Sequence, residues 1–297
     1  MLRQASLGVI MLLATIAGPA YGQEVKLQLK FKEGDKFYVE DVNKSKETVT
    51  AVGITQTTEN KITSVTSFTV KKVTTDATEV DMKIESVDVQ SNGQDGLLGK
   101  VMGKMKGAVF TVTLAPDGKI KKFEGYKQWA KSVVGDDDEM SKFLGMLLSE
   151  DLFVNMVEKG FTFLPDKSVK KGDTWSNDTR IPFSFMGELK SKNTYTYDGK
   201  EKDLDVIAIK QSMKYTPPKA GTEILGGLAK ITRADLKVNN ANGKYFFDAD
   251  KGRLEKVEMA MTVSGSLTID VGGQQQLDLN IVSNGTSRVL DKSPAKD

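Results

Sequence analysis

Long stretches of this chain alternate between apolar and polar residues, which is the pattern of a β-strand with one buried face. The alternation is strict over residues 25–31, and β-branched and aromatic residues continue it to about residue 88. The same pattern returns at residue 170 and runs to about residue 290. The sequence therefore predicts a mainly β protein with a small helical segment, built on curved antiparallel sheet.

Turn signals containing glycine separate the alternating runs. Pro116-Asp117-Gly118 lies between two alternating runs in residues 110–123 and predicts a hairpin. Four further hairpins are predicted in the second half of the chain, at Asp198-Gly199, Asn242-Gly243, Asp250-Lys251-Gly252 and Gly272-Gly273. Tight connections of this kind join antiparallel strands.

Residues 126–158 have helical rather than strand periodicity. Apolar residues recur at helical spacing after Tyr126, and again in residues 140–148. Ser149 is suited to cap another helix, and Gly160 to end it. We expect these helices to cover one face of the sheet, because their apolar stripes need a partner.

Two short motifs occur twice. Residues 32–37 resemble residues 170–175, and residues 117–123 resemble residues 251–257, at offsets of 138 (Gly34 to Gly172) and 134 (Gly118 to Gly252). The repetition predicts two duplicated β halves, although reuse of common turn chemistry is the alternative explanation. The predicted organisation is a signal peptide (1–22), an N-terminal β half (23–125), a helical connector or lid (126–165), a C-terminal β half (166–290) and a disordered tail (291–297).

The first 22 residues are typical of a cleavable signal peptide. Arg3 is their only charged residue, an apolar run spans residues 7–17, and Ala20 and Gly22 supply the two small residues that the peptidase requires. The run is shorter than the roughly 20 residues that a membrane-spanning helix needs. We expect cleavage after Gly22 and an exported protein, periplasmic or extracellular, with no transmembrane segment in the mature chain.

The absence of histidine and cysteine excludes several chemistries. Ser-His-Asp and Cys-His catalysis, His-ligated zinc or haem, disulfides and iron–sulfur clusters are all impossible. The mature chain carries 41 Lys and Arg against 40 Asp and Glu, scattered along the strands, so it has no basic face for nucleic acid. The sequence predicts no metal site and no cofactor. Asp248–Gly252 fits a hairpin turn better than a calcium loop, and the acid run 136–139 fits a helix start.

The candidate ligand-lining residues form two apolar stripes. The first lies in the glycine-rich segment 96–107, and the second in the predicted helices. Segment 96–107 is suited to a mobile flap over an apolar ligand or to contact with a membrane surface, and ordinary packing against the sheet is the alternative for both stripes. The candidates are Leu97, Leu98, Val101, Met102, Met105, Trp129, Phe143, Leu147, Phe153 and Met156.

The signal peptide, the lack of Cys and His, the Gly-Asp-aromatic strand starts at Gly34 and Gly172 and the central helices resemble an uncharacterised family of exported bacterial proteins, a domain of unknown function. More distantly, the chain is similar to the periplasmic lipoprotein-carrier fold, a curved antiparallel sheet closed by helices around an apolar cavity. This resemblance implies a non-catalytic protein that binds a lipid or another hydrophobic small molecule in the cell envelope. The alternatives are an envelope structural module that contacts other proteins and, last, a hydrolase that uses carboxylates.

Overall fold

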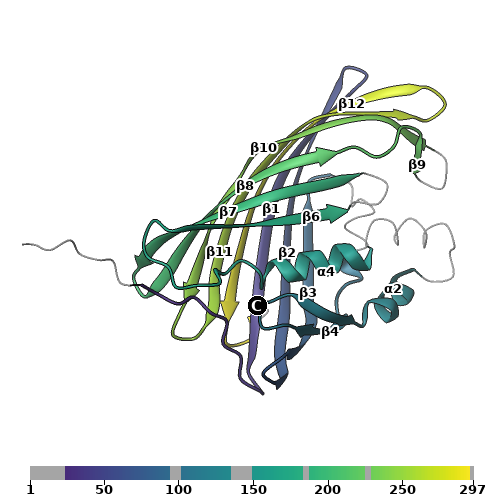
Figure 1. The fold of residues 1–297 in the computed structure, drawn as a ribbon. Coiled ribbons are helices and arrows are strands. Elements are labelled where there is room, and N and C mark those ends of the chain that lie inside the picture. Colours follow the sequence, from purple (N-terminus) through teal and green to yellow (C-terminus); the bar gives the residue numbers. More distant parts are fainter. Residues whose placement is uncertain (1–23, 94–101, 135–148, 183–186, 225–228, 295–297) are drawn as a thin grey trace, which may run out of the picture.

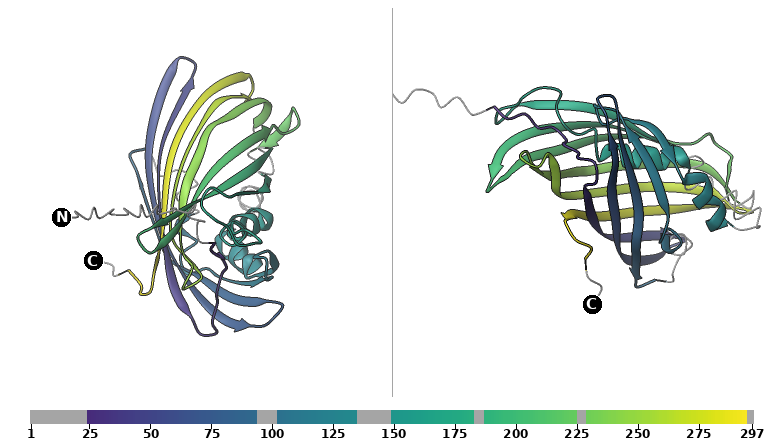
Figure 2. Two further views of the ribbon diagram at one scale, coloured as in Figure 1. Left: turned by 60° about the vertical axis from the view of Figure 1, so that its left-hand side comes forward. Right: turned by 90° about the horizontal axis from the view of Figure 1, so that it is seen from below.

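The computed structural model describes residues 24–93, 102–134, 149–182, 187–224 and 229–294. Within them the fold is one open antiparallel sheet of 12 strands, with two short helices on its concave side (Figures 1 and 2). The predicted mainly β, antiparallel architecture is confirmed. The strands are β1 (Lys36–Ala51), β2 (Ile54–Val73), β3 (Thr78–Ser91), β4 (Val109–Leu114), β5 (Ile120–Glu124), β6 (Thr174–Pro182), β7 (Glu188–Glu201), β8 (Leu204–Thr216), β9 (Thr222–Ile224), β10 (Ala229–Asp248), β11 (Arg253–Asp270) and β12 (Gln274–Leu290).

The sheet order places the first and last strands side by side at its centre. The order is β5-β4-β3-β2-β1-β12-β11-β10-β8-β7-β6, and β9 adds to β10. β1 pairs with β12 from Tyr38 opposite Leu290 to Ala51 opposite Leu277. The chain therefore forms one meander from the centre to one edge and a second meander from the other edge back to the centre.

Three of the five predicted hairpin turns are confirmed. The turn at Pro116-Asp117-Gly118 connects β4 and β5, Asp250-Lys251-Gly252 connects β10 and β11, and Gly272-Gly273 connects β11 and β12. Gly118 and Gly272 adopt positive φ angles of 82° and 92°, which glycine reaches without strain.

The other two predicted turns are wrong. Asn242-Gly243 lies inside β10, where a Cβ on Gly243 would collide with the Glu258 carbonyl oxygen and the Met259 sulfur, so this glycine allows two strands to approach closely. Gly199 lies inside β7 at a register shift opposite β8, with φ of 95°. It forms a β-bulge, and the chain reverses after it, at Lys202.

The two Gly-Asp motifs form turns with the same hydrogen bonds. Gly34 donates to Val70 and Gly172 to Tyr197, and these residues donate back to Asp35 and Asp173, respectively. Each aspartate carboxylate also accepts from the backbone N–H three residues earlier. Both turns precede the first strand of a meander, and β5-β4-β3-β2-β1 and β11-β10-β8-β7-β6 run in the same direction across the sheet.

Residues 25–31 alternate in burial as predicted but do not form a strand of the sheet. Leu27 is buried and Val25, Leu29 and Phe31 are partly buried, whereas the intervening residues are exposed. The segment makes a single bridge, between Val25 and Val169, and the Lys30 N–H donates to Gly252. We call residues 24–35 the N-terminal strap, because its apolar side packs on the sheet and its polar side faces solvent.

The helices are α2 (Tyr126–Val134) and α4 (Glu150–Lys159). The Ser149 side chain accepts from the Leu152 N–H, and Gly160 ends α4, so both predicted caps are confirmed. Glu158 of α4 accepts from the Ile120 N–H and thereby fixes the helix to β5. The predicted helix at 140–148 and residues 94–101 of the glycine-rich segment lie outside the described residues. No helix in the described part of the chain is long and apolar enough to cross a membrane.

The core consists of three apolar clusters. One joins β3 and β4 to the two helices around Phe110. The second joins the strap and residues 163–169 to β7, β8 and β10 around Phe163 and Phe247, both fully buried. The third lies between β2, β3 and β4 around Val70 and Val112. A cavity remains beside these clusters, where the strap and α4 cross the centre of the sheet.

Candidate functional site: an apolar cavity on the sheet

A cavity of about 720 Å³ lies between the sheet, α4 and the N-terminal strap. Its walls come from the central strands β1, β2, β11 and β12, with Met82 of β3. Twelve of its lining residues are apolar: Leu29, Phe31, Phe37, Val39, Phe68, Met82, Met156, Val157, Phe161, Leu254, Val257 and Val289.

Strand register explains the apolar floor of the cavity. Phe37 of β1 lies opposite Phe68 of β2, which lies opposite Met82 of β3. The Phe37 and Phe68 rings stack with centroids 5.1 Å apart and an interplanar angle of 4°. Val39 lies opposite Val289 of β12 and continues the floor across the centre of the sheet. Cross-strand neighbours on one face thus provide a continuous apolar surface.

The strap and α4 form the other wall. Phe31 of the strap and Phe161, just after α4, meet edge to face with centroids 6.3 Å apart. Met156 of α4 also lines the cavity, although 63% of its surface is exposed to solvent. An unbranched, polarisable side chain in that position adapts to ligands of different shape.

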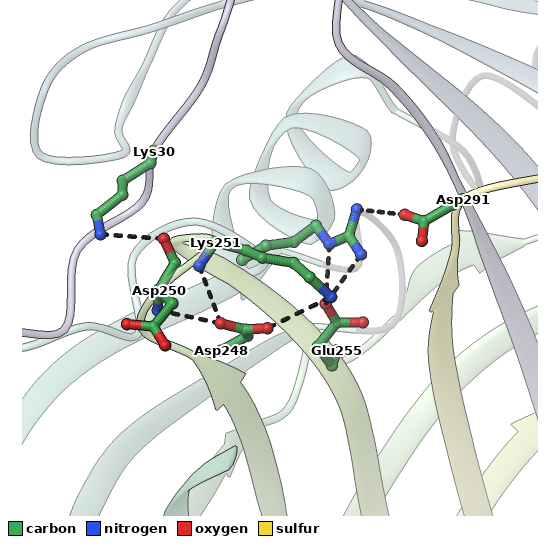
Figure 3. A network of polar contacts seen from close by, with 7 residues as sticks. Lys30, Asp248, Asp250, Lys251, Glu255 and Asp291 are labelled. Atoms are coloured by element: carbon green, nitrogen blue, oxygen red, sulfur yellow. Dashed lines mark hydrogen bonds and ion pairs between the residues drawn. The ribbon is translucent and has the colours of Figure 1, made fainter. Parts of the chain in front are cut away.

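A charged network forms the rim of the cavity (Figure 3). Arg253 donates to Glu255 and, at 2.8 Å, to Asp291 beyond the end of β12, and its guanidinium lies 6.0 Å from the centre of the Phe37 ring. Lys251 is 3.1 Å from Glu255 and 3.4 Å from Asp248. The hydrogen bond from Arg253 lowers the pKa of the Asp291 carboxyl. The Lys30 ammonium donates to the Ala249 carbonyl at 2.8 Å, so the rim joins the strap, the β10–β11 hairpin and the end of β12.

One carboxylate lies at the opposite end of the cavity from this rim. Asp41 shares the face of Phe37 and Val39 on β1, because alternate residues of a strand point the same way. It accepts a hydrogen bond from the Ser287 hydroxyl of the neighbouring β12. Burial raises the pKa of the Asp41 carboxyl above its ordinary value, and the hydrogen bond from Ser287 offsets only part of that rise.

The structure brings some of the predicted site residues together. Met105, Trp129 and Phe153 are buried in one cluster with Phe110, and Met102 packs against it. Met156 lines the cavity. The other candidates, Leu97, Leu98, Val101, Phe143 and Leu147, lie outside the described residues. None of the described residues form a group of three acidic side chains that could hold a metal ion.

Sequence reasoning missed most of the cavity. Phe37, Val39 and Asp41 are alternate residues of a predicted strand, so their side chains share one face, and this alternation is the sequence signal that could have identified part of the cavity. Nothing in that alternation indicates that Val289 and Ser287 are their neighbours, because the pairing joins residues almost 250 positions apart. The arrangement can enclose an apolar molecule and present one carboxylate to it.

The solved structures that resemble this chain share little of its sequence. No curated protein matches the chain. Among solved structures, lipovitellin is 8% identical over 90% of this chain, with a TM-score of 0.43, and the chain spans only 26% of lipovitellin. DynF from the dynemicin biosynthesis pathway of Micromonospora chersina is 11% identical over 90% of this chain and 85% of its own, with a TM-score of 0.20. The outer membrane protein OprG from Pseudomonas aeruginosa is 6% identical over 88% of this chain and 99% of its own, with a TM-score of 0.21. TM-scores this low do not establish a shared fold.

A family model gives a more direct relationship. Residues 59–281 match the model described as a family of unknown function, DUF6263. The match begins in β2 and ends in β12, and so includes both helices and every strand from β3 to β11 but not β1. The chain therefore belongs to the DUF6263 family.

Proposed function

We propose that this protein is an exported, non-catalytic binding protein whose ligand, a lipid or another hydrophobic molecule, occupies the cavity between the strap, α4 and the sheet. The observation that carries the proposal is the cavity itself, about 720 Å³ in volume with a continuous floor of Phe37, Phe68, Met82, Val39 and Val289. Small-molecule sites are concave, largely apolar and roughly 300–1,000 Å³ in volume, with a few polar groups that orient the ligand.

The charges around the cavity support binding rather than hydrolysis. A hydrolase that uses carboxylates needs two of them facing each other across the substrate. Here Glu255 and Asp291 both pair with Arg253, the Asp35 carboxylate accepts from the Lys32 N–H, and Asp250 is exposed to solvent, whereas Asp41 accepts from the Ser287 hydroxyl. One observation favours the alternative of a protein-interaction module: β5 and β6 form the two edges of an open sheet, and an open edge can accept a strand from a partner.

Substitutions that fill the cavity test the proposal. We expect an uncharged fluorescent probe, N-phenyl-1-naphthylamine, to bind the full mature protein. Val39→Trp should weaken binding by about tenfold or more, since the added ring occupies the floor of the cavity. Val42→Trp is the matched control, because Val42 lies on the same strand but on the opposite face and should leave the affinity unchanged. Absence of probe binding to the wild-type protein would favour the interaction module.

Export is tested by the N-terminus of the mature protein. We expect secretion in a bacterial host to yield a product that begins at Gln23, because Ala20 and Gly22 fit the signal peptidase. N-terminal sequencing of the fractionated protein measures this directly. A product that retains Met1 in the cytoplasmic fraction would contradict export but would leave the binding proposal untouched.

We also infer that the two meanders are copies of one five-stranded unit. The first copy is β1–β5, and the second is β6, β7, β8, β10 and β11. The short strand β9 is an addition to β10, and β12 lies between the two copies in the sheet. The matching hydrogen bonds at Gly34 and Gly172 support this inference. So does a β-bulge at the equivalent place in each copy, between Val70 and Lys72 and between Tyr197 and Gly199. Turn chemistry alone does not require the bulges to coincide.

A further inference from the structure

The cavity has a charged rim at one end and the Asp41 carboxylate at the other. Along β1 the residues that face the cavity are Phe37, Val39 and Asp41, and Phe37 lies beneath Arg253 of the rim. At about 3.3 Å per residue, Asp41 lies roughly 13 Å beyond Phe37 along the strand. The row at Asp41 continues with Ser287 of β12 and Val257 of β11. An apolar molecule that enters over Phe37 would therefore meet Asp41 at its far end.

Asp41 differs from the acids of the rim in its partners. Glu255 pairs with Arg253 and Lys251, and Asp291 pairs with Arg253, whereas Asp41 accepts one hydrogen bond, from an uncharged hydroxyl. Among the described residues, no Lys or Arg forms an ion pair with Asp41. The adjacent Glu40 pairs with Arg288, which lies directly opposite it on β12. Asp41 is partly buried. A carboxylate that is partly removed from water and has no cationic partner destabilises the folded state, and a protein is expected to keep one where a ligand supplies the partner.

We propose that Asp41 binds the protonated amine of a cationic amphiphile, so that the ligand of this cavity is an apolar chain or ring system that carries an ammonium group. This inference rests on the proposed function. An ammonium group forms a charge-assisted hydrogen bond with a carboxylate, which is roughly twice as strong as a neutral one. A ligand carboxylate or phosphate would instead be repelled by Asp41, and the rim cations Arg253 and Lys251 are already paired with acids.

Three ligands with the same twelve-carbon chain test the inference by displacing N-phenyl-1-naphthylamine from the full mature protein. Dodecylamine should bind more tightly than dodecanol, and dodecanol more tightly than dodecanoate. Asp41→Asn should weaken dodecylamine binding by about tenfold, which is the effect of losing one charge-assisted contact. The same variant should leave dodecanol binding within about twofold and improve dodecanoate binding. Asp250→Asn is the control: it removes one negative charge at the exposed rim and should preserve the wild-type order.

Thermal unfolding separates a binding defect from a folding defect. Because the pKa of Asp41 is raised in the folded state, the charged carboxylate destabilises the fold above that pKa and the protonated one does not. Asp41→Asn should therefore melt at a higher temperature than the wild type at neutral pH, and the difference should vanish below the ordinary pKa of aspartate. Equal affinities of the wild type for dodecylamine and dodecanol, or an unchanged amine affinity in Asp41→Asn, would overturn the inference and leave the proposed function intact. Failure of both dodecanol and the probe to bind would instead contradict the proposed function.

Discussion

Replacing Phe110 with alanine is expected to lower the free energy of unfolding by about 3–5 kcal/mol, the range for truncating a buried phenylalanine. Phe110 is 2% exposed and stacks on Phe123 with ring centroids 5.4 Å apart. It also contacts Trp129 of α2 and Phe153 of α4, at centroid distances of 6.2 and 5.8 Å. The substitution would leave a cavity where both helices meet the sheet.

Chemical denaturation measures this cost against a neighbouring control. Val109 precedes Phe110 on β4, points to the opposite face and is 48% exposed. Val109→Ala should cost less than about 1 kcal/mol, because surface substitutions away from special features have small effects. If both variants lost the same stability, the aromatic cluster would not anchor the helices to the sheet.

Replacing Gly118 with alanine is expected to cost about 2–5 kcal/mol, from two separate causes. Gly118 has a φ of 82°, where a Cβ atom is strained. The added Cβ would also lie well inside van der Waals contact of the Phe161 carbonyl oxygen, and a backbone atom cannot move aside without displacing the end of α4. Since Phe161 lines the cavity, the variant should also weaken probe binding.

Gly34 and Gly172 provide matched controls for Gly118. Their φ angles are 87° and 92°, but a Cβ at either position meets no atom within 4 Å. Each alanine variant should therefore show the conformational cost alone, about 1–2 kcal/mol. Equilibrium unfolding of the three variants isolates the contact with Phe161, and equal losses in all three would rule out that close approach. Equal losses at Gly34 and Gly172 alone are expected from their matching turns.

Strands and caps were predictable because their signals are local. Alternation identified most of the strand-forming chain, and the Ser149 cap and the Gly160 end marked α4 correctly. The Asn242-Gly243 error shows where local signals fail. The dipeptide has the composition of a turn, but Gly243 is needed because β11 passes too close for a side chain. Only the packed structure distinguishes a glycine used for φ from one used for space.

The candidate site was less predictable, for a related reason. Alternation assigns Phe37, Val39 and Asp41 to one face of a strand but does not identify the partner strand. Trp129 and Phe153 have the helical spacing expected of an apolar stripe, and the structure packs both against Phe110 rather than into the cavity. The strap has the alternation of a strand, yet it crosses the sheet as a covering segment. The partner of β1, the packing of the two helices and the position of the strap all depend on long-range contacts, which sequence periodicity does not encode.

The position of β12 has a consequence for the order in which the molecule can be assembled. The β1–β12 pairing connects residues 226 positions apart at Ala51 and Leu277 and 252 apart at Tyr38 and Leu290. Contacts this distant in sequence form slowly, because a long loop must close before any of them stabilises the chain. Each meander is able to form from nearby segments, but β1 and β11 remain exposed edges until the last strand arrives. The ligand cavity spans that same junction, so it comes into existence only when the C-terminal end of the chain is available.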